Sequence, residues 1–220
     1  MSLEHQARTP FNWRLESTET HGFSEELKRK ELILKAATTL FANQGYSGTS
    51  VKQIVEMAGV TKPTLYYYFK NKEDLYLQLI DDSMQTFFTI FDGAAKVDGT
   101  MRVRLITILA EIYRLLRENT DLLRLVNSIV YGPRGAAPVY DLKSRNQQFE
   151  TALRHILRSG IDEGELGEED IDKVLLLLVG LIRSIQLFLV VKPASKAIPL
   201  EQVKSAIDMI FDGAKRSAAS

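Results

Sequence analysis

Apolar residues recur at helical spacing along most of the chain. Within residues 25–43, and again within 101–118, they return every third or fourth position, a pattern typical of helices that bury one face. Strict alternation of apolar and polar residues, the signature of β-hairpins, is absent. The pattern predicts an all-α protein of about nine helices. The expected helices span 25–43, 50–59, 61–69, 71–91, 101–118, 121–130, 139–162, 170–191 and 200–211.

Caps and breakers define the first four helix boundaries. A short polar side chain before an apolar run accepts a hydrogen bond from a free N–H of the first helical turn. The expected N-caps are Ser24, Ser50, Thr61 and Asn71. Ser50 is followed three positions later by Gln53, which completes a capping box, while Gly45 and Gly59 are expected to end the preceding helices.

The two short helices within 50–69 form the most informative segment. They are joined by Ala58-Gly59-Val60, and a glycine accepts the positive φ that a tight turn between two steeply crossing helices requires. This is the pattern of a helix-turn-helix unit, whose second helix presents its N-terminal residues to the DNA major groove. Thr61, Lys62 and Thr64 supply hydroxyls and an ammonium at that position.

Charge is unevenly distributed along the chain. The 220 residues contain 28 Lys plus Arg and 28 Asp plus Glu, so the formal net charge is zero. Residues 21–72 hold eight basic and four acidic side chains, a net charge of +4, and the remainder of the chain is slightly acidic. A basic segment ahead of a larger acidic one favours an anion-binding module attached to another domain.

The segment around the helix-turn-helix resembles the N-terminal signature of TetR-family transcriptional regulators. The resemblance runs almost without gaps from Leu32 to Leu75, about a fifth of the chain. The matching segments are Gly45-Tyr46, Thr49-Ser50-Val51, Ile54, Ala58-Gly59-Val60-Thr61-Lys62, Thr64-Leu65-Tyr66-Tyr67-Tyr68-Phe69 and Lys72-Glu73-Asp74-Leu75. Two positions depart from the family pattern: Val55 stands where alanine is usual, and Pro63 where glycine is usual.

The resemblance implies three regions and a set of DNA contacts. The regions are a flexible N-terminal extension (1–22), a three-helix DNA-binding domain (23–71) and a larger helical domain for ligand binding and dimerisation (72–220). Residues implied to contact phosphates or bases are Thr49, Ser50, Thr61, Lys62, Pro63, Thr64, Tyr66, Tyr67, Tyr68 and Lys72. Leu65 and Phe69 are expected in the core, together with one of the three tyrosines, because consecutive helical residues cannot all face one surface.

The resemblance also implies a homodimer and a small-molecule effector. Two copies would bind a palindromic operator, with the last two helices pairing across the interface. The implied interface residues are Leu178, Leu181, Ile185, Phe188, Val203, Ile207 and Ile210. An effector in the C-terminal domain would release the DNA, with the helix that starts at Lys72 linking the two sites. Candidate effector contacts are Met84, Phe87, Phe88, Phe91, Tyr113, Leu116, Asn127, Tyr131, Arg183 and Gln186, most of which could equally be plain core.

The apolar run 174–191 is long enough to approach a membrane span. It carries Arg183, Ser184 and Gln186 near its middle, so a buried helix of a soluble core or interface is the better interpretation. A buried Arg183 requires an acceptor, which could be an acidic ligand, a carboxylate of another helix or a residue of a second copy.

Other classes of function are weaker. The three histidines are scattered and the chain has no cysteine, so we expect no enzyme, no metal site and no cofactor. The N-terminus lacks the apolar region of a secretory signal, and we expect a cytoplasmic protein without a membrane partner. The hypothesis is therefore a ligand-responsive DNA-binding regulator, a repressor by the family's usual habit. The alternative is a helical protein-interaction module without sequence-specific DNA binding. Sequence leaves open the operator, the effector, the regulated genes and the role of residues 1–22.

Overall fold

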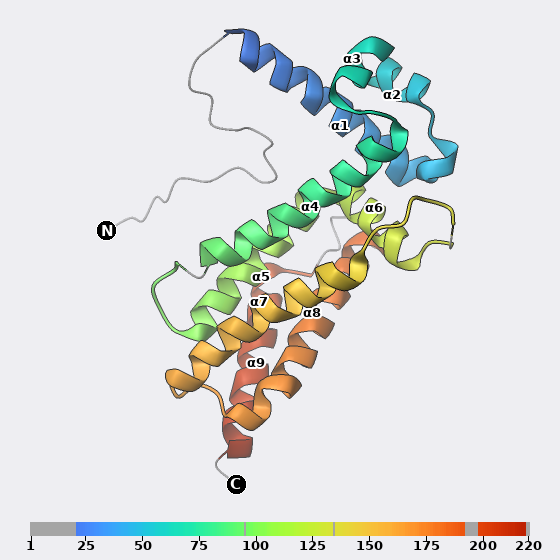
Figure 1. Ribbon diagram of the computed structural model, residues 1–220. Helices are drawn as coiled ribbons and strands as arrows, with labels where there is room; N and C mark the ends of the chain where they lie inside the picture. Colours follow the sequence, from blue (N-terminus) through green and yellow to red (C-terminus); the bar gives the residue numbers. More distant parts are fainter. Residues whose placement is uncertain (1–20, 95, 134, 192–197, 219–220) are drawn as a thin grey trace.

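The computed structural model describes residues 21–94, 96–133, 135–191 and 198–218. Within these ranges the chain forms nine α-helices and one short 3-10 turn, with no β-strand, as the hydrophobic pattern predicts (Figure 1). The elements are α1 (His21–Gly48), α2 (Val51–Ala58), α3 (Lys62–Tyr68), α4 (Lys72–Ala94), α5 (Met101–Glu118), α6 (Thr120–Tyr131), α7 (Leu142–Asp162), η1 (Glu168–Asp170), α8 (Ile171–Val191) and α9 (Leu200–Ala218).

The expected helices are confirmed, and their ends are corrected at several places. α1 already includes His21, so Ser24 lies inside the helix and does not cap it, and the expected extension 1–22 is shortened; residues 1–20 lie outside the described part. Gly45 breaks α1 with a φ of 71°, as expected, but one further turn follows it before Gly48. α7 begins at Leu142 because the side chain of Asp141 accepts a hydrogen bond from the Ser144 N–H and caps the helix there.

Helices α1 to α3 form a compact head at one end of the molecule (Figure 1). Its core consists of buried side chains from α1, α2 and α3, the first half of α4 and two leucines of α6. Polar contacts add to this packing: the Thr39 hydroxyl donates to Asp121 of α6 at 3.1 Å, and the Ser47 hydroxyl donates to the Ala136 carbonyl at 2.9 Å. The head is thus attached to the rest of the chain through α6 as well as α4.

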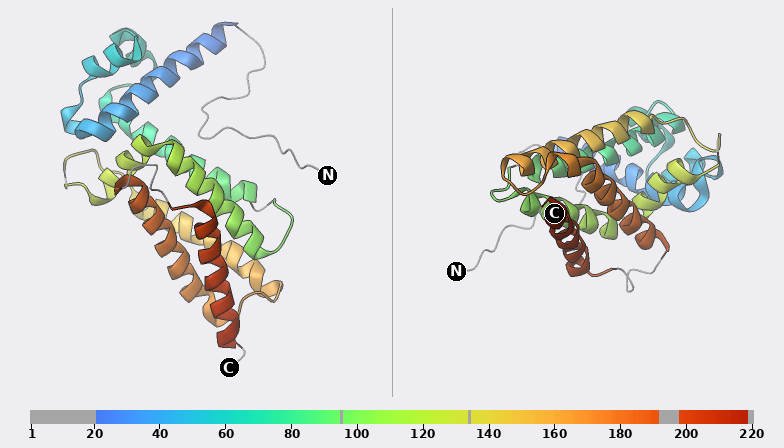
Figure 2. Two further views of the ribbon diagram at one scale, coloured as in Figure 1. Left: turned by 180° about the vertical axis from the view of Figure 1, so that it is seen from behind. Right: turned by 90° about the horizontal axis from the view of Figure 1, so that it is seen from below.

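The second half of α4 joins α5, α7, α8 and α9 in an elongated helical body, in which α8 and α9 run side by side (Figures 1 and 2). Arg102 of α5 ties α9 to this body through Asp208 at 3.2 Å and Asp212 at 3.0 Å. The same guanidinium lies over the Phe211 ring, so one side chain joins polar and apolar contacts between the two helices.

α4 belongs to both parts of the molecule. Leu75, Tyr76 and Ile80 are buried in the core of the head, whereas Phe91 and Ala94 are buried in the core of the body. The boundary expected at residue 72 therefore falls at the start of a shared helix rather than between two cores. Any tilt of α4 in the body moves a helix that is packed inside the head.

α8 has the length and composition of a membrane span. With the turn before it, α8 forms an apolar helical segment of 24 residues. In its most apolar stretch, 39% is buried inside the protein. Its buried residues include Leu178, Ile182 and Ile185, which lie at the centre of the body's core. The helix thus serves as a central packing element of the body, as the sequence predicts.

Candidate DNA-binding and effector sites

The turn between α2 and α3 has the geometry of a helix-turn-helix. Gly59 ends α2 in the left-handed region, with φ 66° and ψ 30°, as its position in the sequence predicts. The Val60 N–H then donates to the Val55 carbonyl at 3.0 Å, which closes the turn. Ile54 and Leu65 are fully buried between the two helices, so the angle of α3 is fixed by packing on both sides of the glycine.

The first turn of α3 presents its polar side chains to solvent. The Thr61 hydroxyl accepts from the Thr64 N–H at 3.3 Å and lies 2.8 Å from the Thr64 hydroxyl, which confirms the expected N-cap. Thr61, Lys62 and Pro63 are exposed, and Thr64 is half-buried. Capping thus occupies part of the hydrogen-bonding capacity of Thr61, while Lys62 and the Thr64 side chain remain at the surface expected to face DNA.

The three consecutive tyrosines of α3 take different roles. Tyr68 is half-buried, and its hydroxyl donates to the Glu26 carbonyl at 2.9 Å, so it is the tyrosine that joins the core. Tyr66 and Tyr67 are 50% and 71% exposed. The Tyr67 hydroxyl donates to the Glu26 carboxylate at 2.8 Å, and this hydrogen bond raises the pKa of Tyr67. Both rings are accessible to a ligand, but Tyr67 is held against α1.

The structure corrects the expected phosphate contact of Thr49. Its side chain is only 2% exposed, and its hydroxyl donates to the Gly45 carbonyl at 2.8 Å, so it stabilises the end of α1 instead of facing solvent. Ser50 is exposed, yet its hydroxyl belongs to the capping box with Gln53. The residues of α3 are therefore better placed for the expected DNA contacts than Thr49 and Ser50, which precede α2.

Lys72 joins the start of α4 to the end of α1. Its ammonium donates to the carbonyls of Tyr46 and Thr49, both at 2.9 Å, and lies 4.1 Å from the centroid of the Tyr46 ring. Burial lowers the pKa of Lys72. Two of its three donors are thus committed inside the head, and the implied phosphate contact has one donor left.

A small, partly open cavity lies in the body, between α4, α6, α7 and α8. Its volume is about 70 Å³, and its wall is mostly apolar. Five of the ten residues expected at an effector site line it: Met84, Phe87, Phe88, Arg183 and Gln186. The side chains that complete it are Val126, Val130, Leu142, Arg145, Asn146, Phe149, Val179 and Ile182.

The other five expected effector contacts lie elsewhere. Tyr113 and Leu116 are buried in the main core of the body, where the Tyr113 hydroxyl donates to the Ile198 carbonyl. Asn127 donates back to the Leu123 carbonyl within its own helix, and Tyr131 is exposed at the end of α6. Phe91 faces the outer side of the seam between α4 and α7, not the small cavity. Helical spacing identifies buried positions but does not separate core from cavity wall.

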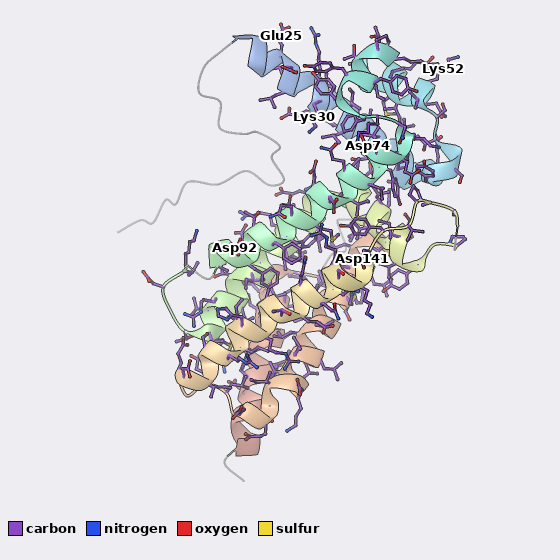
Figure 3. All side chains as sticks on the ribbon, viewed as in Figure 1. Glu25, Lys30, Lys52, Asp74, Asp92 and Asp141 are labelled. Carbon is purple, nitrogen blue, oxygen red and sulfur yellow. The ribbon has the colours of Figure 1, made fainter. Side chains whose placement is uncertain are left out.

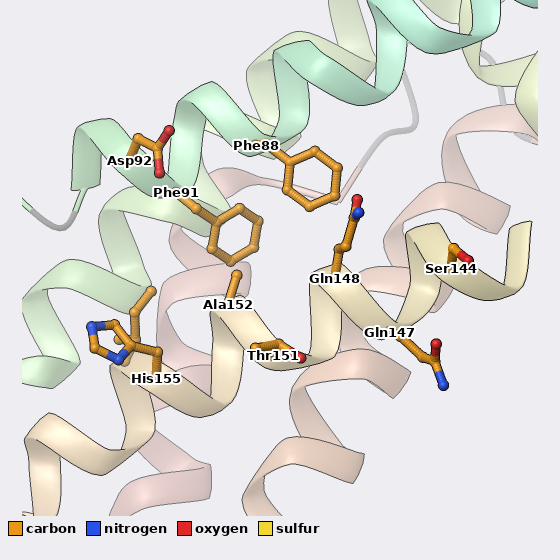
Figure 4. A pocket seen from close by; sticks show the side chains of 10 residues that line it. Phe88, Phe91, Asp92, Ser144, Gln147, Gln148, Thr151, Ala152 and His155 are labelled. Atoms are coloured by element: carbon orange, nitrogen blue, oxygen red, sulfur yellow. The ribbon is translucent and has the colours of Figure 1, made fainter.

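An open groove of about 690 Å³ runs along the outer side of the α4–α7 seam (Figure 4). Phe88 and Phe91 project into it from α4, facing Gln148 and Ala152 on α7. Phe91 also packs edge-to-face against Phe149 at 5.3 Å between ring centroids. Phe88 lines both the groove and the small cavity, so its ring lies between the two spaces.

Arg183 lies at the cavity wall and is held by neutral partners. Its guanidinium donates to Gln186 and to Asn146 of α7, each at 3.2 Å. Among the residues that the structure describes, no carboxylate lies within ion-pairing distance of it. Of the acceptors considered from the sequence, a carboxylate of another helix is therefore not supported within the described chain.

The expected dimer residues divide into two groups. Leu178, Ile185, Val203 and Ile207 are buried in the core of their own chain, which corrects their assignment to an interface. Leu181 and Ile210 are half-buried, and Phe188 remains partly exposed. The outward face carries other large apolar side chains that the helical pattern did not single out. These are Leu176, Leu177, Leu187, Val191 and Met209.

The head combines a glycine turn between two helices with exposed hydroxyl and lysine side chains on α3. The body holds an apolar cavity. These features define a DNA-binding regulator with a separate sensing domain. Comparisons with known proteins agree. The family model described as "Bacterial regulatory proteins, tetR family" matches residues 33–79. The Fatty acid metabolism regulator protein of Bacillus subtilis (strain 168) is 28% identical over 136 residues, which cover 62% of this chain and 70% of that protein.

Solved structures extend the similarity to the body. A Clostridium perfringens protein proposed to regulate fatty acid metabolism superimposes with a TM-score of 0.69 and 26% identity, over 83% of this chain and 97% of that one. The regulator FadR of Bacillus subtilis, solved with stearoyl-CoA, gives a TM-score of 0.66 at 24% identity, over 83% and 98% of the two chains. Residues 33–79 match the DNA-binding domain described for the tetR family, and the chain is a ligand-responsive DNA-binding regulator similar to members of that family along most of its length.

Proposed function

We propose that this regulator binds a palindromic operator as a homodimer and leaves it when a small-molecule effector enters the body. The observation that carries the proposal is the exposed N-terminal turn of α3, set behind the left-handed turn at Gly59. A single seven-residue helix reads only a few base pairs, so a second copy is needed for a specific site. Repression is the proposed direction of control.

The outward face of α8 and α9 supports the homodimer. Leu176 and Met209 are each 73% exposed, and Leu177 and Met209 also border a hollow of about 390 Å³ between the two helices. A continuous apolar surface of this kind is typical of an interface between subunits. Two copies related by a twofold axis would bury it and bring the two heads to the same side of the assembly.

The proposed effector class follows from the cavity and from the relatives. The Bacillus subtilis relative is named for fatty acid metabolism, and the FadR structure contains stearoyl-CoA. The cavity of this chain has apolar walls formed by Phe87, Phe88, Phe149 and Ile182, which suit an alkyl chain. Fatty acids and their thioesters are therefore the first effectors to test.

We propose that the protein acts by binding alone, in the cytoplasm, without catalysis. The relatives are transcriptional regulators. Within the described residues, no group of three or more His, Asp and Glu side chains is arranged to hold a metal ion. Thr151 and His155 both line the groove, but among the described residues no hydrogen bond joins a hydroxyl to this imidazole, as an activated nucleophile would require.

Fluorescence anisotropy with labelled duplexes from upstream of the protein's own coding sequence tests the DNA-binding proposal. At low salt, the wild-type chain is expected to bind the upstream duplex with higher affinity than a scrambled duplex of the same composition. Lys62→Met and Thr64→Val should weaken binding about tenfold or more without loss of helical circular dichroism. Lys143→Met, which removes an exposed lysine of the body, is the matched control and should leave binding unchanged. Equal affinity of wild type for both duplexes would contradict the proposal.

A further inference from the structure

The α4–α7 seam is closed by a polar network at one end and by aromatic contacts along its length. Arg145 of α7 donates to the Asp81 carboxylate of α4 at 2.7 Å and to the Tyr140 hydroxyl at 3.1 Å. The Tyr140 hydroxyl in turn donates to Asp81 at 2.7 Å. Burial, reinforced by the hydrogen bond to Asp81, raises the pKa of Tyr140 to about 12, so this hydroxyl keeps its proton at neutral pH. We call Asp81, Tyr140 and Arg145 the seam latch.

The latch and the cavity share a residue. Arg145 lines the small cavity while its guanidinium donates to Asp81. Asp81 lies on α4 directly after Ile80, which is buried in the head, and shortly before Met84, which lines the cavity. The latch therefore spans the point where α4 passes from the head to the effector site.

The cavity is too small for a ligand in this conformation. Its volume of about 70 Å³ holds about two water molecules, whereas small-molecule sites occupy roughly 300–1,000 Å³. The wall is formed by Met84, Phe87 and Phe88 of α4 on one side and by Arg145 and Phe149 of α7 on the other. Separation of these two helices enlarges the cavity, carries Phe88 away from α7 and lengthens the Arg145–Asp81 contact. A ligand that needs more room than this cavity offers would therefore have to open the latch.

The polar side chains of the cavity favour an anion. Arg183 and Arg145 both reach its wall, and the acceptors to which Arg183 donates are weakly competing amide oxygens. A buried or half-buried guanidinium binds a carboxylate or phosphate more strongly than an amide oxygen, because both partners are charged. Within the described chain, the cavity wall carries no Asp or Glu that would repel such a group.

We propose that the effector is an amphiphile whose anionic group binds Arg183 and draws Arg145 from Asp81, so that the alkyl chain fills the widened cavity and the seam latch opens. This inference rests on the proposed function and names the ligand class and the switch of that site. The free energy that widens the seam comes from the new ion pair and from the apolar contacts of the alkyl chain. By linkage, any change that weakens the latch alone must tighten effector binding.

Isothermal titration calorimetry on the full chain without DNA tests the anion site. The probes are laurate and lauroyl-CoA below their critical micelle concentrations and 1-dodecanol below its solubility limit. Laurate or lauroyl-CoA should bind at least about tenfold more tightly than the neutral alcohol. Arg183→Gln should remove most of this preference and change alcohol binding less than twofold. Arg158→Gln, an exposed arginine of α7 outside the cavity, is the control and should change neither. If only the affinity for lauroyl-CoA depends on Arg183, the group that binds Arg183 is a phosphate rather than a carboxylate, and the ligand class is unchanged.

The latch is tested with Asp81→Ala and Tyr140→Phe. Asp81→Ala should tighten binding about threefold to tenfold, the range for a partly exposed ion pair supported by hydrogen bonds. Tyr140→Phe removes the shared hydroxyl without changing charge and should act in the same direction. Asp172→Ala breaks the comparable Arg154–Asp172 ion pair at 2.7 Å between α7 and α8, and should leave affinity unchanged.

Three results would overturn the proposal. The first is equal binding of laurate, lauroyl-CoA and dodecanol, or no binding of any of them, since the anion site then does not exist. The second is an Asp81→Ala effect limited to the anionic probes, which simple removal of a negative charge would explain. The third is unchanged affinity in both latch variants. Because no DNA is present, failure here is separate from failure of operator binding.

Discussion

Replacing Lys72 separates its structural role from the phosphate contact that the family resemblance implies. In Lys72→Met the apolar stem is kept and the ammonium is lost. The structure assigns that ammonium two hydrogen bonds of 2.9 Å to the carbonyls of Tyr46 and Thr49, and a position 4.1 Å from the Tyr46 ring centroid. Loss of the ammonium also leaves these two carbonyls without this donor at the end of α1.

The magnitude follows from these contacts. Hydrogen bonds to a charged group contribute about 1.5–3 kcal/mol each, and a cation–π contact adds about 0.5–1 kcal/mol. The ammonium is only partly buried, so water can hydrogen-bond to the freed carbonyls in the variant. Hydration therefore offsets most of the free energy that these contacts contribute. We expect a net loss of about 2 kcal/mol in the free energy of unfolding. For a chain of this length, that corresponds to a fall in Tm of roughly 4–8 °C.

Thermal denaturation followed by circular dichroism measures the stability, and anisotropy titrations at several salt concentrations measure the phosphate contact. Removal of a residue that neutralises a phosphate reduces the slope of log K, the DNA association constant, against log salt by about one. We expect Lys72→Met to lower Tm while the slope stays constant, and Lys62→Met to lower the slope while Tm stays constant. Unchanged Tm together with a reduced slope for Lys72→Met would refute the structural assignment of Lys72.

Three further predictions concern the turn, the interface and acid stability. Gly59→Ala should cost about 1–2 kcal/mol through its φ of 66° alone, since the added Cβ meets nothing within 4 Å, and urea denaturation measures the loss. Leu187→Asp should convert a dimer to a well-folded monomer in analytical ultracentrifugation, whereas Leu178→Ala, in the core, should cost about 2–5 kcal/mol and leave the dimer intact; the reverse pattern would contradict the assigned faces. The hydrogen bond from Arg104, aided by a backbone N–H, lowers the pKa of Glu163 below its usual 4.5. Glu163 therefore stabilises the fold above about pH 4.5, and this contribution is lost as pH falls through the lowered pKa, so Glu163→Gln should flatten the fall in Tm on acidification.

The helices and the turn were predictable because local signals determine them. Ser50, Thr61 and Gly59 act within three or four residues of their own positions, and the structure has the caps and the left-handed turn that they predict. Leu65 and Phe69, expected in the core, are likewise buried. These features depend on hydrogen bonds and sterics inside one element or between neighbouring elements.

The cavity wall and the subunit surface were less predictable because they depend on contacts between distant segments. Arg145 and Phe149 reach the cavity only because α7 lies against α4, and the polar character of α7 gave no sign of this. Thr49 fits the sequence pattern of a phosphate contact, yet the kink at Gly45 brings a carbonyl within reach and its hydroxyl bonds there. Leu178 and Leu176 are chemically alike, and only the packing of α8 against its neighbouring helices decides which one is buried.

Selection of duplexes from a random-sequence library by the purified full chain tests the central claim most directly. The account predicts enrichment of one inverted repeat, whose two half-sites reflect the two heads of a dimer. It also predicts that Lys62→Met fails to enrich that repeat, while Lys143→Met enriches it as wild type does. No enriched sequence from a folded wild-type protein, or an enriched motif that both variants select equally well, would contradict the claim that α3 reads DNA.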